Sequence, residues 1–225
     1  MRMPPVGPPL LLGHRGARGI RSIPENTFAS FDRALADGCD GFEFDVRVTS
    51  DGGPVVCHDP RFKRIEIAQA TADRLPELPL LEQVLDRYAQ RAFLDIELKV
   101  AGVEGVTASL LRNFPPRRGF VISSFLPNVL ERLHALNSTI PLGLICEKKK
   151  ELLGWSRLPI EYVIPHKNLA QPRLLEEWKG AQKKVLVWTV NELRAMRRLR
   201  DWGVDGIISD DPALLAKTLA NSTSA

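Results

Sequence analysis

Two carboxylates occur two residues apart in segment 41–48, where apolar and polar side chains alternate. This alternation predicts a β-strand, in which Glu43 and Asp45 point to one side and their apolar neighbours to the other. Glu97 occupies the same kind of position in segment 92–99. Carboxylates that are buried together repel one another and are costly to desolvate, and a bound cation relieves both costs. The pattern therefore indicates a metal site made by Glu43, Asp45 and Glu97.

The ligand types indicate which ion such a site would hold. No Cys-x-x-Cys pair and no two histidines at ligand spacing accompany the carboxylates. An all-carboxylate set favours one divalent ion that prefers oxygen ligands, Mg²⁺ or Ca²⁺, over Zn²⁺. The alternative is that these acids form structural ion pairs with Arg15, Arg47 and Lys99.

Histidines and cations flank the acidic positions. His14 and His58 each stand at the end of a predicted strand. Because imidazole gains and loses a proton near neutral pH, both are candidates for a general acid or base. Arg15 and Lys99 are suited to gripping an anionic oxygen, Arg through two parallel hydrogen bonds and Lys as a point charge. Of the other histidines, His134 is expected on a helix surface.

Short apolar runs alternate with amphipathic segments along the whole chain, which predicts parallel strands joined by crossover helices. The expected strands are 9–14, 41–48, 92–99, 119–124, 141–146, 161–165, 184–189 and 204–209. The expected helices are 24–37, 80–90, 103–113, 127–137, a weak one at 147–158, 171–181, 191–201 and 211–220.

Eight strand–helix units predict an α/β fold, a TIM (β/α)₈ barrel formed by residues 1–225 as a single domain. A hairpin turn at 51–53, a strand at 54–58 and an irregular stretch at 59–78 make a short insertion after the second strand. Active sites of such barrels lie at the carboxyl ends of the strands. His14, Glu43, Asp45 and Glu97 all fall there, whereas His166, after the sixth strand, is a weaker candidate for the same rim.

Composition narrows the function class. A net charge of +4 suits an anionic small molecule and is no nucleic-acid signature. The basic runs at 148–150 and 194–200 are interpreted as solvated faces.

The chain contains no run of about 18 apolar residues, so stable membrane insertion is not expected. The proline-rich first residues make a poor signal peptide. They are interpreted as an irregular lead-in to the first strand. Three cysteines without a Cys-x-x-Cys pair predict reduced thiols and a cytoplasmic location. The oligomeric state stays open.

An ordered series of motifs resembles the glycerophosphodiester phosphodiesterase family over nearly the whole chain. The series is His14-Arg15-Gly16, Pro24-Glu25-Asn26-Thr27, Glu43-Phe44-Asp45-Val46, His58-Asp59, Glu97-Leu98-Lys99, Ser123-Ser124-Phe125, Trp188-Thr189-Val190-Asn191 and 203–212. Single members of the series are weak signals, whereas the ordered set is highly specific.

The resemblance implies metal-dependent hydrolysis of a glycerophosphodiester to sn-glycerol 3-phosphate and an alcohol. It implies that the ion binds to Glu43, Asp45 and Glu97. It also implies an acid–base pair of His14 and His58, and phosphate contacts from Arg15 and Lys99. The nucleophile is either water or a hydroxyl of the substrate.

The resemblance extends to supporting residues. Trp188 would line the alcohol side of the substrate, and Asp59 would support His58. Glu25 and Asn26 would organise the loop after the first strand, with Asn26 as the cap of the following helix. The family usually has a longer segment after His58-Asp59, so the shortened stretch here should leave the site more open and the alcohol undetermined.

Three other functions compete with this interpretation. A lysophospholipase D-like activity would require an apolar rim, for which Phe62, Ile65 and Ile67 are candidates. A non-catalytic phosphodiester-binding barrel would predict a lost histidine or carboxylate, and none is lost. A metal-dependent isomerase or aldolase is disfavoured, because neighbouring carboxylates should keep Lys99 charged and therefore a poor nucleophile.

Overall fold

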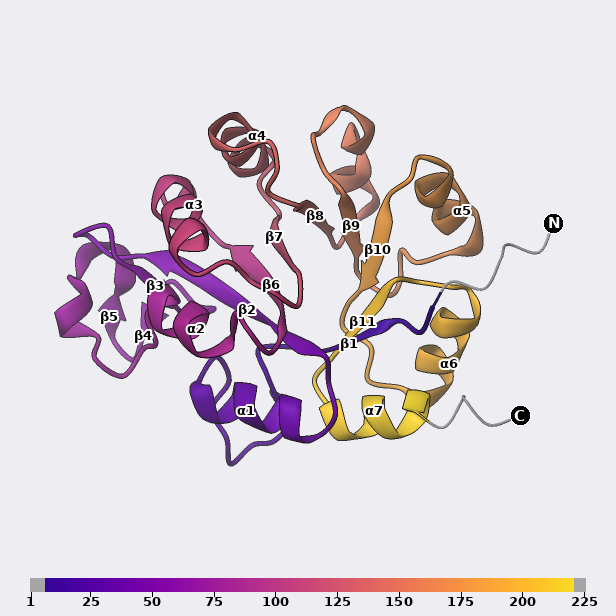
Figure 1. Cartoon of the computed structure of the whole chain (residues 1–225), viewed down its shortest axis with the longest axis horizontal. Helices are drawn as coiled ribbons and strands as arrows, with labels where there is room; N and C mark the ends of the chain where they lie inside the picture. Colours follow the sequence, from indigo (N-terminus) through magenta and orange to yellow (C-terminus); the bar gives the residue numbers. More distant parts are fainter. Residues whose placement is uncertain (1–6, 221–225) are drawn as a thin grey trace.

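A computed structural model describes residues 7–220, so residues 1–6 of the expected lead-in lie outside it. Its main sheet is a closed ring of parallel strands with helices around it (Figure 1). The strands are β1 (Leu10–Gly13), β2 (Gly41–Val48), β6 (Phe93–Leu98), β7 (Phe120–Ser124), β8 (Leu142–Cys146), β9 (Tyr162–Pro165), β10 (Lys184–Val187) and β11 (Gly206–Ser209). Because β1 pairs with both β11 and β2, the eight-stranded barrel closes as the sequence predicts.

Helices follow most of the strands and cover the outside of the barrel. They are α1 (Phe28–Ala36), α2 (Leu81–Tyr88), α3 (Glu104–Asn113), α4 (Pro127–Leu136), α5 (Pro172–Gly180), α6 (Leu193–Asp201) and α7 (Pro212–Ala220). Within residues 7–220, no helix has the length and apolar character needed to cross a membrane.

The connection between β8 and β9 differs from the prediction. The weak α-helix expected at 147–158 is absent, and two short 3₁₀ turns, η3 (Lys149–Leu152) and η4 (Trp155–Arg157), take its place. Gly154 between them has a φ of +84°, a left-handed conformation that no right-handed helix contains. The prediction was wrong because one glycine divides a segment too short to form two helices.

The alternation in β2 has the predicted outcome on both of its faces. Phe42, Phe44 and Val46 are fully buried against the surrounding helices. Phe42 stacks on Phe31 of α1 with ring centroids 4.2 Å apart, and Tyr88 of α2 meets Phe42 edge-on at 5.0 Å. This aromatic contact fixes β2 against its helices, so its other face is directed into the barrel.

The barrel interior changes from apolar to acidic along the strands. An interior cluster of buried side chains is formed by Leu12, Phe93, Val121, Ile145, Tyr162, Ile164, Leu186 and Ile208. On β6, Phe93 belongs to this cluster, whereas Asp95 and Glu97 follow it on the same face towards the carboxyl end. The apolar layer therefore closes the barrel below an acidic layer.

The insertion after β2 projects from one side of the barrel, at the left of Figure 1. It contains β3 (Pro54–Val56), which pairs antiparallel with β2, the hairpin β4 (Arg61–Phe62) and β5 (Ile65–Glu66), and the turns η1 (Ile67–Gln69) and η2 (Ala72–Arg74). Ile67 is 1% exposed and packs in a small core of this insertion. The expectation that Ile67 belongs to an apolar rim was therefore wrong, whereas Ile65 is exposed.

Candidate active site

The loop between β1 and α1 folds back over the carboxylates of β2. Arg15 and Gly16 have φ values of +50° and +80°, and a Cβ on Gly16 would lie 2.4 Å from Ser30 Oγ. This conformation lets the backbone N–H of Arg15 donate to Glu43 Oε2 at 3.0 Å. Because only glycine fits the second position without strain or collision, the His14-Arg15-Gly16 motif has a geometric reason for its last residue.

Asn26 joins the same loop to the acidic layer. Its Nδ2 donates to Asp45 Oδ2 at 2.8 Å, and its Oδ1 accepts from the Asp45 backbone N–H at 3.3 Å. The helix cap is Thr27, whose side chain accepts from the backbone N–H of Ser30. The expectation that Asn26 caps α1 was therefore wrong, because its φ of +58° turns its side chain to Asp45 instead.

Glu43, Asp45 and Glu97 come together as the alternation predicts. Each offers an oxygen that lies within 4.8 Å of the others, and all three side chains are buried. The strand register explains this, because Asp45 on β2 is paired with Glu97 on β6. Glu43 Oε1 is buried and has no hydrogen-bond partner among the described residues. Converging buried oxygens, one of them without a donor, fit a hard divalent ion.

Burial and mutual repulsion control the charges of this cluster. Burial, followed by the charges of Asp45 and Glu97, raises the pKa of Glu43 well above its ordinary value. Burial and Asp45 likewise raise the pKa of Glu97 to about 7. Burial opposes ionisation of Asp45 too, but Lys99 and Arg15 hold its pKa below the ordinary value. Without an ion, the cluster thus retains protons that a divalent cation would displace.

Arg15 and Lys99 both contact the acidic layer. Lys99 Nζ lies 2.8 Å from Glu97 Oε1 and 3.3 Å from Asp45 Oδ1. Arg15 Nε lies 3.2 Å from Asp45 Oδ2, and its terminal nitrogen lies 2.7 Å from Glu25 Oε1. Arg47 does not join them, since its Nε donates to the backbone oxygen of His58. The alternative interpretation, in which Arg15, Arg47 and Lys99 form structural ion pairs with the three acids, is therefore wrong for Arg47.

The two candidate histidines both line the cavity, and each contacts a carboxylate through Nδ1. His14 Nδ1 lies 2.6 Å from Asp210 Oδ1, and its Nε2 lies 3.8 Å from Glu43 Oε2. His58 Nδ1 lies 2.7 Å from Asp59 Oδ1, and burial lowers the pKa of His58. Because an ionised carboxylate only accepts hydrogen bonds, each imidazole is left with Nε2 for other chemistry.

Asp210 is a site residue that the sequence reasoning did not single out. Its Oδ2 accepts from Asn191 Nδ2 at 2.7 Å, and Arg18 lies beside it. Burial opposes its ionisation, but the hydrogen bond from His14 and the contact with Asn191 hold its pKa far below the ordinary value. Its position immediately after β11, at the carboxyl end of a barrel strand, was a signal that could have found it.

A cavity of about 220 Å³ unites the predicted residues. It is lined by His14, Arg15, Glu43, His58, Asp95, Glu97, Lys99, Phe125, Ile145, Glu147, Trp188 and Ile208. Asp45 lies just behind this lining, in contact with Lys99 and Arg15. All seven residues predicted to bind metal, phosphate or protons are thus brought together, and Trp188 lines the same cavity.

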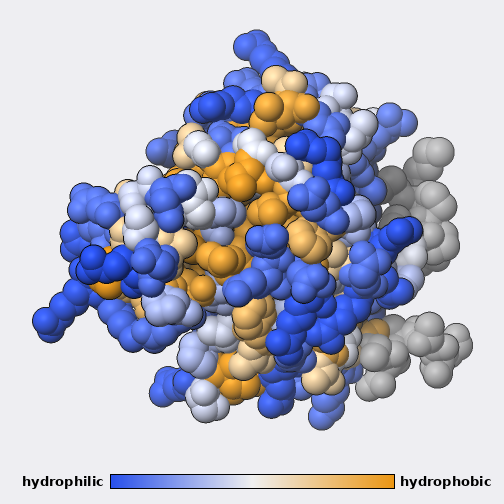
Figure 2. Space-filling model, turned by 60° about the vertical axis from the view of Figure 1, so that its left-hand side comes forward, coloured by the Kyte–Doolittle hydropathy of each residue, from blue (hydrophilic) through white to orange (hydrophobic). Residues whose placement is uncertain are grey.

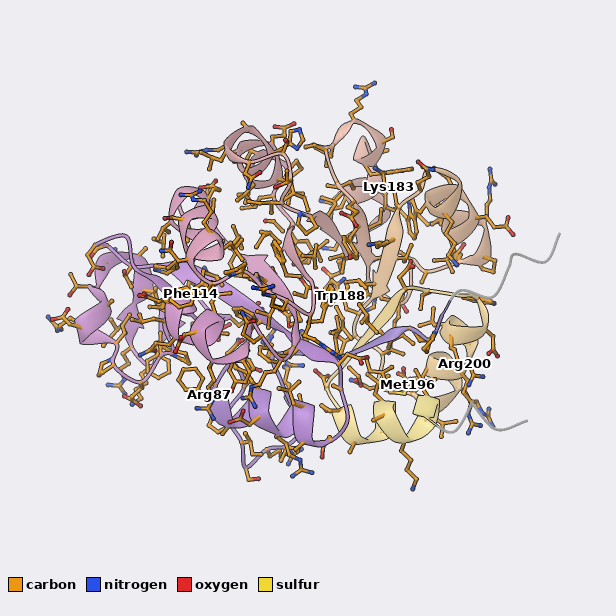
Figure 3. All side chains as sticks on the ribbon, viewed as in Figure 1. Arg87, Phe114, Lys183, Trp188, Met196 and Arg200 are labelled. Atoms are coloured by element: carbon orange, nitrogen blue, oxygen red, sulfur yellow. The ribbon has the colours of Figure 1, made fainter. Side chains whose placement is uncertain are left out.

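An apolar wall closes one side of the cavity. Trp188 lies close to the middle of the molecule in Figure 3, and its indole N–H donates to the backbone oxygen of Ile164 at 2.9 Å. Its ring meets Phe125 and His166 edge-on, at centroid distances of 5.7 and 5.4 Å. His166 therefore packs on Trp188 and is not among the residues that line the cavity, whereas His134 is exposed on α4 as expected. Figure 2 shows a face on which hydrophobic side chains gather between hydrophilic ones.

Comparisons with known proteins agree with this geometry. The model of the "Glycerophosphoryl diester phosphodiesterase family" matches residues 14–214. A glycerophosphodiester phosphodiesterase of Caldanaerobacter subterraneus is 29% identical, over 92% of this chain and 96% of its own.

Solved structures share the fold. A glycerophosphodiester phosphodiesterase from Parabacteroides distasonis superposes with a TM-score of 0.85 at 24% identity, covering 96% of this chain and 98% of its own. An Oleispira antarctica phosphodiesterase, solved in complex with the product sn-glycerol-3-phosphate, superposes with a TM-score of 0.83 at 24% identity, covering 95% and 98%.

The family match covers almost all of the described chain and begins at His14, the first of the clustered site residues. The chain therefore belongs to the glycerophosphoryl diester phosphodiesterase family of phosphoric diester hydrolases.

Proposed function

We propose that this enzyme hydrolyses glycerophosphodiesters to sn-glycerol 3-phosphate and an alcohol, with one divalent ion, Mg²⁺ or Ca²⁺, and with His14 and His58 as the acid–base pair. The observation that carries the proposal is the single cavity onto which two imidazoles, two cations and the acidic cluster converge. Those are the groups that a phosphodiester anion needs for cleavage. The barrel alone would not specify this reaction.

The acidic cluster is the part of the site suited to an ion. Glu43, Asp45 and Glu97 would hold it, since their buried oxygens lie within 4.8 Å of one another. When bound, a divalent cation draws electron density from phosphoryl oxygens and neutralises charge that repels a nucleophile. No Cys or His ligand lies in this set, which favours Mg²⁺ or Ca²⁺ over Zn²⁺.

Arg15 and Lys99 would orient the phosphodiester. Both line the cavity, and burial is outweighed by carboxylate neighbours that raise the pKa of each, so both stay charged. Guanidinium offers five N–H donors, so its contacts with Glu25 and Asp45 leave others for a phosphoryl oxygen. A charged Lys99 also speaks against an aldolase-type Schiff base, which requires a neutral amine.

The histidines would divide the proton transfers. One imidazole removes the proton of the nucleophile as its oxygen bonds to phosphorus, and the other protonates the alkoxide as the phosphorus–oxygen bond to the alcohol breaks. Asp210 would hold His14 through Nδ1, and Asp59 would hold His58 in the same way. These contacts direct each Nε2 to the reacting group. Water and a hydroxyl of the glycerol arm are both compatible with this arrangement.

The apolar wall would receive one arm of the diester. Phe125, Ile145 and Trp188 also line the cavity and offer ring and aliphatic surface. Trp188 would be the main contact, because its hydrogen bond to Ile164 and its packing on Phe125 hold the indole ring in place. Such a wall suits the carbon atoms of an alcohol or of glycerol, with the phosphate directed to the cations.

The test is a product analysis with two glycerophosphodiesters, glycerophosphocholine and glycerophosphoethanolamine, and with glycerol 3-phosphate as the phosphomonoester control. We expect both diesters to release sn-glycerol 3-phosphate and the free alcohol, and the monoester to remain intact. Lysophosphatidylcholine, tested in parallel, should react more slowly. Release of the phosphorylated alcohol, or hydrolysis of the monoester alone, would contradict the proposal.

A further inference from the structure

One buried carboxylate of the cavity has no part in the reaction proposed above. Asp95 is 1% exposed and lines the cavity. Its Oδ1 accepts a hydrogen bond from Ser123 Oγ at 2.5 Å, but its Oδ2 is buried without any partner among the described residues. Burying a carboxylate oxygen without a hydrogen-bond donor is costly, so some other group should donate a hydrogen bond to this oxygen in the working enzyme.

The strand register joins Asp95 to the metal ligands. Glu43 on β2 is paired with Asp95 on β6, and the next inward-facing pair is Asp45 with Glu97. The four carboxylates thus form two rungs on neighbouring parallel strands, which lie about 4.8 Å apart. Asp95 is not in the set whose ligand oxygens all lie within 4.8 Å of one another. It therefore lies beside the ligands, on the rung of Glu43 and one rung deeper in the barrel than Asp45 and Glu97.

When all four carboxylates are ionised, the charges of these rungs do not balance without an ion. The rungs carry four carboxylates, and two cations, Arg15 and Lys99, contact them through Asp45 and Glu97. Glu43 and Asp95 have no cation partner of this kind within residues 7–220, apart from a 3.8 Å contact between Glu43 and His14. Ionised together, the rungs are two positive charges short, which is the charge of one divalent ion.

We infer that Asp95 is the fourth carboxylate of the metal centre. It does not bind the ion directly but supplies negative charge and, through Oδ2, an acceptor for the water that hydrates the ion. Ser123 holds its other oxygen and so directs Oδ2 into the cavity. Partners that surround metal ligands in this way commonly change metal affinity by about 10- to 100-fold. The inference rests on the metal part of the proposed function.

A purely structural Asp95 would behave differently under one substitution. Asn has almost the same shape and its oxygen can still accept from Ser123, but it has no charge and offers a donor where Oδ2 was. Asp95→Asn should therefore preserve a structural role and damage a role in ion binding. Glu104→Gln is the matched control, because Glu104 is also a buried carboxylate, 2% exposed, but lies on α3 beside Arg132.

The experiment is titration of the metal-free full chain with Mn²⁺, followed by calorimetry and by the electron paramagnetic resonance signal of free Mn²⁺. We expect Asp95→Asn to raise the Kd by about 10- to 100-fold, and Glu104→Gln to leave it within about twofold. Ser123→Ala, which frees Asp95 to turn, should have an intermediate effect. Circular dichroism and melting temperature establish that each variant is folded.

The outcomes separate this inference from the proposed function. If the wild-type protein binds Mn²⁺ and Asp95→Asn binds it equally well, Asp95 is structural and only this inference fails. If the wild-type protein binds no Mn²⁺, the inference and the metal-dependent reaction fail together. If Asp95→Asn does not fold, Asp95→Ser and Asp95→Ala are titrated instead, and wild-type affinity in a folded one of them would overturn the inference.

Discussion

At the scale of single residues, the account depends on two imidazoles that are held through the same nitrogen by different carboxylates. His14 is tied to a partly buried Asp210 and His58 to a largely exposed Asp59. A general acid must supply a proton to the leaving alkoxide, so its importance depends on how basic that alkoxide is. The alcohol of the substrate can therefore distinguish the two histidines.

We expect His14→Asn and His58→Asn each to lower turnover of glycerophosphoethanolamine by about 10²-fold or more. With a diester whose alcohol is 4-nitrophenol, which leaves without protonation, the variant that lacks the acid should recover most of this loss and the other should not. Steady-state rates on both substrates give the answer. Equal losses of both variants on both substrates would show that the two histidines do not divide the proton transfers.

Asp210 should act through His14. We expect Asp210→Asn to lower kcat by about 10²- to 10⁴-fold with little change in KM, because an amide no longer fixes the tautomer of the imidazole. The pH profile of kcat should shift as well, which a merely structural role would not cause. Asp211→Asn is the control, since Asp211 is exposed and caps α7 through the backbone of Leu214. Wild-type kcat in Asp210→Asn would rule out the positioning role.

The sequence predicted the site residues well where a local pattern places them. Period-two alternation placed Glu43, Asp45 and Glu97 on one face, and the structure brings them within 4.8 Å. Asp95 follows from the same rule, since it stands two residues before Glu97 as Glu43 stands before Asp45, but it was not singled out. The contact between His14 and Asp210 spans 196 residues and depends on closure of the barrel, so no local pattern reveals it.

At the scale of elements, β2 is the strand that positions most of the chemistry. Its outer face packs on aromatic rings, and its first residue, Gly41, touches the neighbouring strand. A Cβ at Gly41 would lie 1.8 Å from the backbone oxygen of Phe93 on β6. Close pairing of β2 with β6 is what aligns Glu43 with Asp95 and Asp45 with Glu97.

We therefore expect Gly41→Ala to destabilise the fold by about 1–3 kcal/mol, because the backbone of β6 must move to admit the methyl group. Gly105→Ala is the matched control. Gly105 lies in α3 with no atom within 4 Å of a Cβ, so alanine there should stabilise by up to about 1 kcal/mol. Urea unfolding measures both. A Gly41→Ala protein as stable as wild type would contradict the tight pairing of β2 and β6.

Element boundaries were predicted to within a few residues because strands and helices of this barrel have clear periods. Strand β2 was predicted with its observed bounds, and α3 within one residue. The exception is 147–158, where Lys148, Lys149 and Lys150 suggested a helix face without an apolar period behind it. Leu152 and Trp155 pack on the barrel from 3₁₀ turns instead. Composition alone cannot distinguish such turns from a poor helix.

At the scale of the whole molecule, stability and metal binding should be linked through the acidic layer. In the metal-free protein burial raises the pKa of Asp95 to about 7, whereas an unfolded chain has the ordinary value near 4. Between about pH 4 and 7 the folded chain therefore binds more protons than the unfolded chain. The contribution of Asp95 to the free energy of unfolding then falls as pH rises through this window and levels off above about 7.

The stability difference between wild type and Asp95→Asn reports this contribution, together with the smaller change at Glu43 and Glu97, whose pKa values the charge of Asp95 also raises. His58 and His166 have lowered pKa values and titrate with the opposite sign, but they are present in both proteins. We expect the free energy of unfolding of wild type in EDTA to fall by about 2 kcal/mol relative to that of Asp95→Asn between pH 5 and 7.5. Each pKa unit corresponds to about 1.4 kcal/mol. Urea unfolding at both pH values tests this. A difference that stays constant or grows in favour of wild type would contradict the raised pKa.

The most direct test of the central claim, an ion held by Glu43, Asp45 and Glu97 in a phosphodiesterase site, is turnover of glycerophosphoethanolamine in chelated buffer with controlled return of metal. The account predicts that EDTA abolishes release of sn-glycerol 3-phosphate, that Mg²⁺, Mn²⁺ or Ca²⁺ restores it, and that Glu43→Ala, still folded, is not restored by any of them. Undiminished turnover in chelated buffer, or a fully active Glu43→Ala protein, would contradict it.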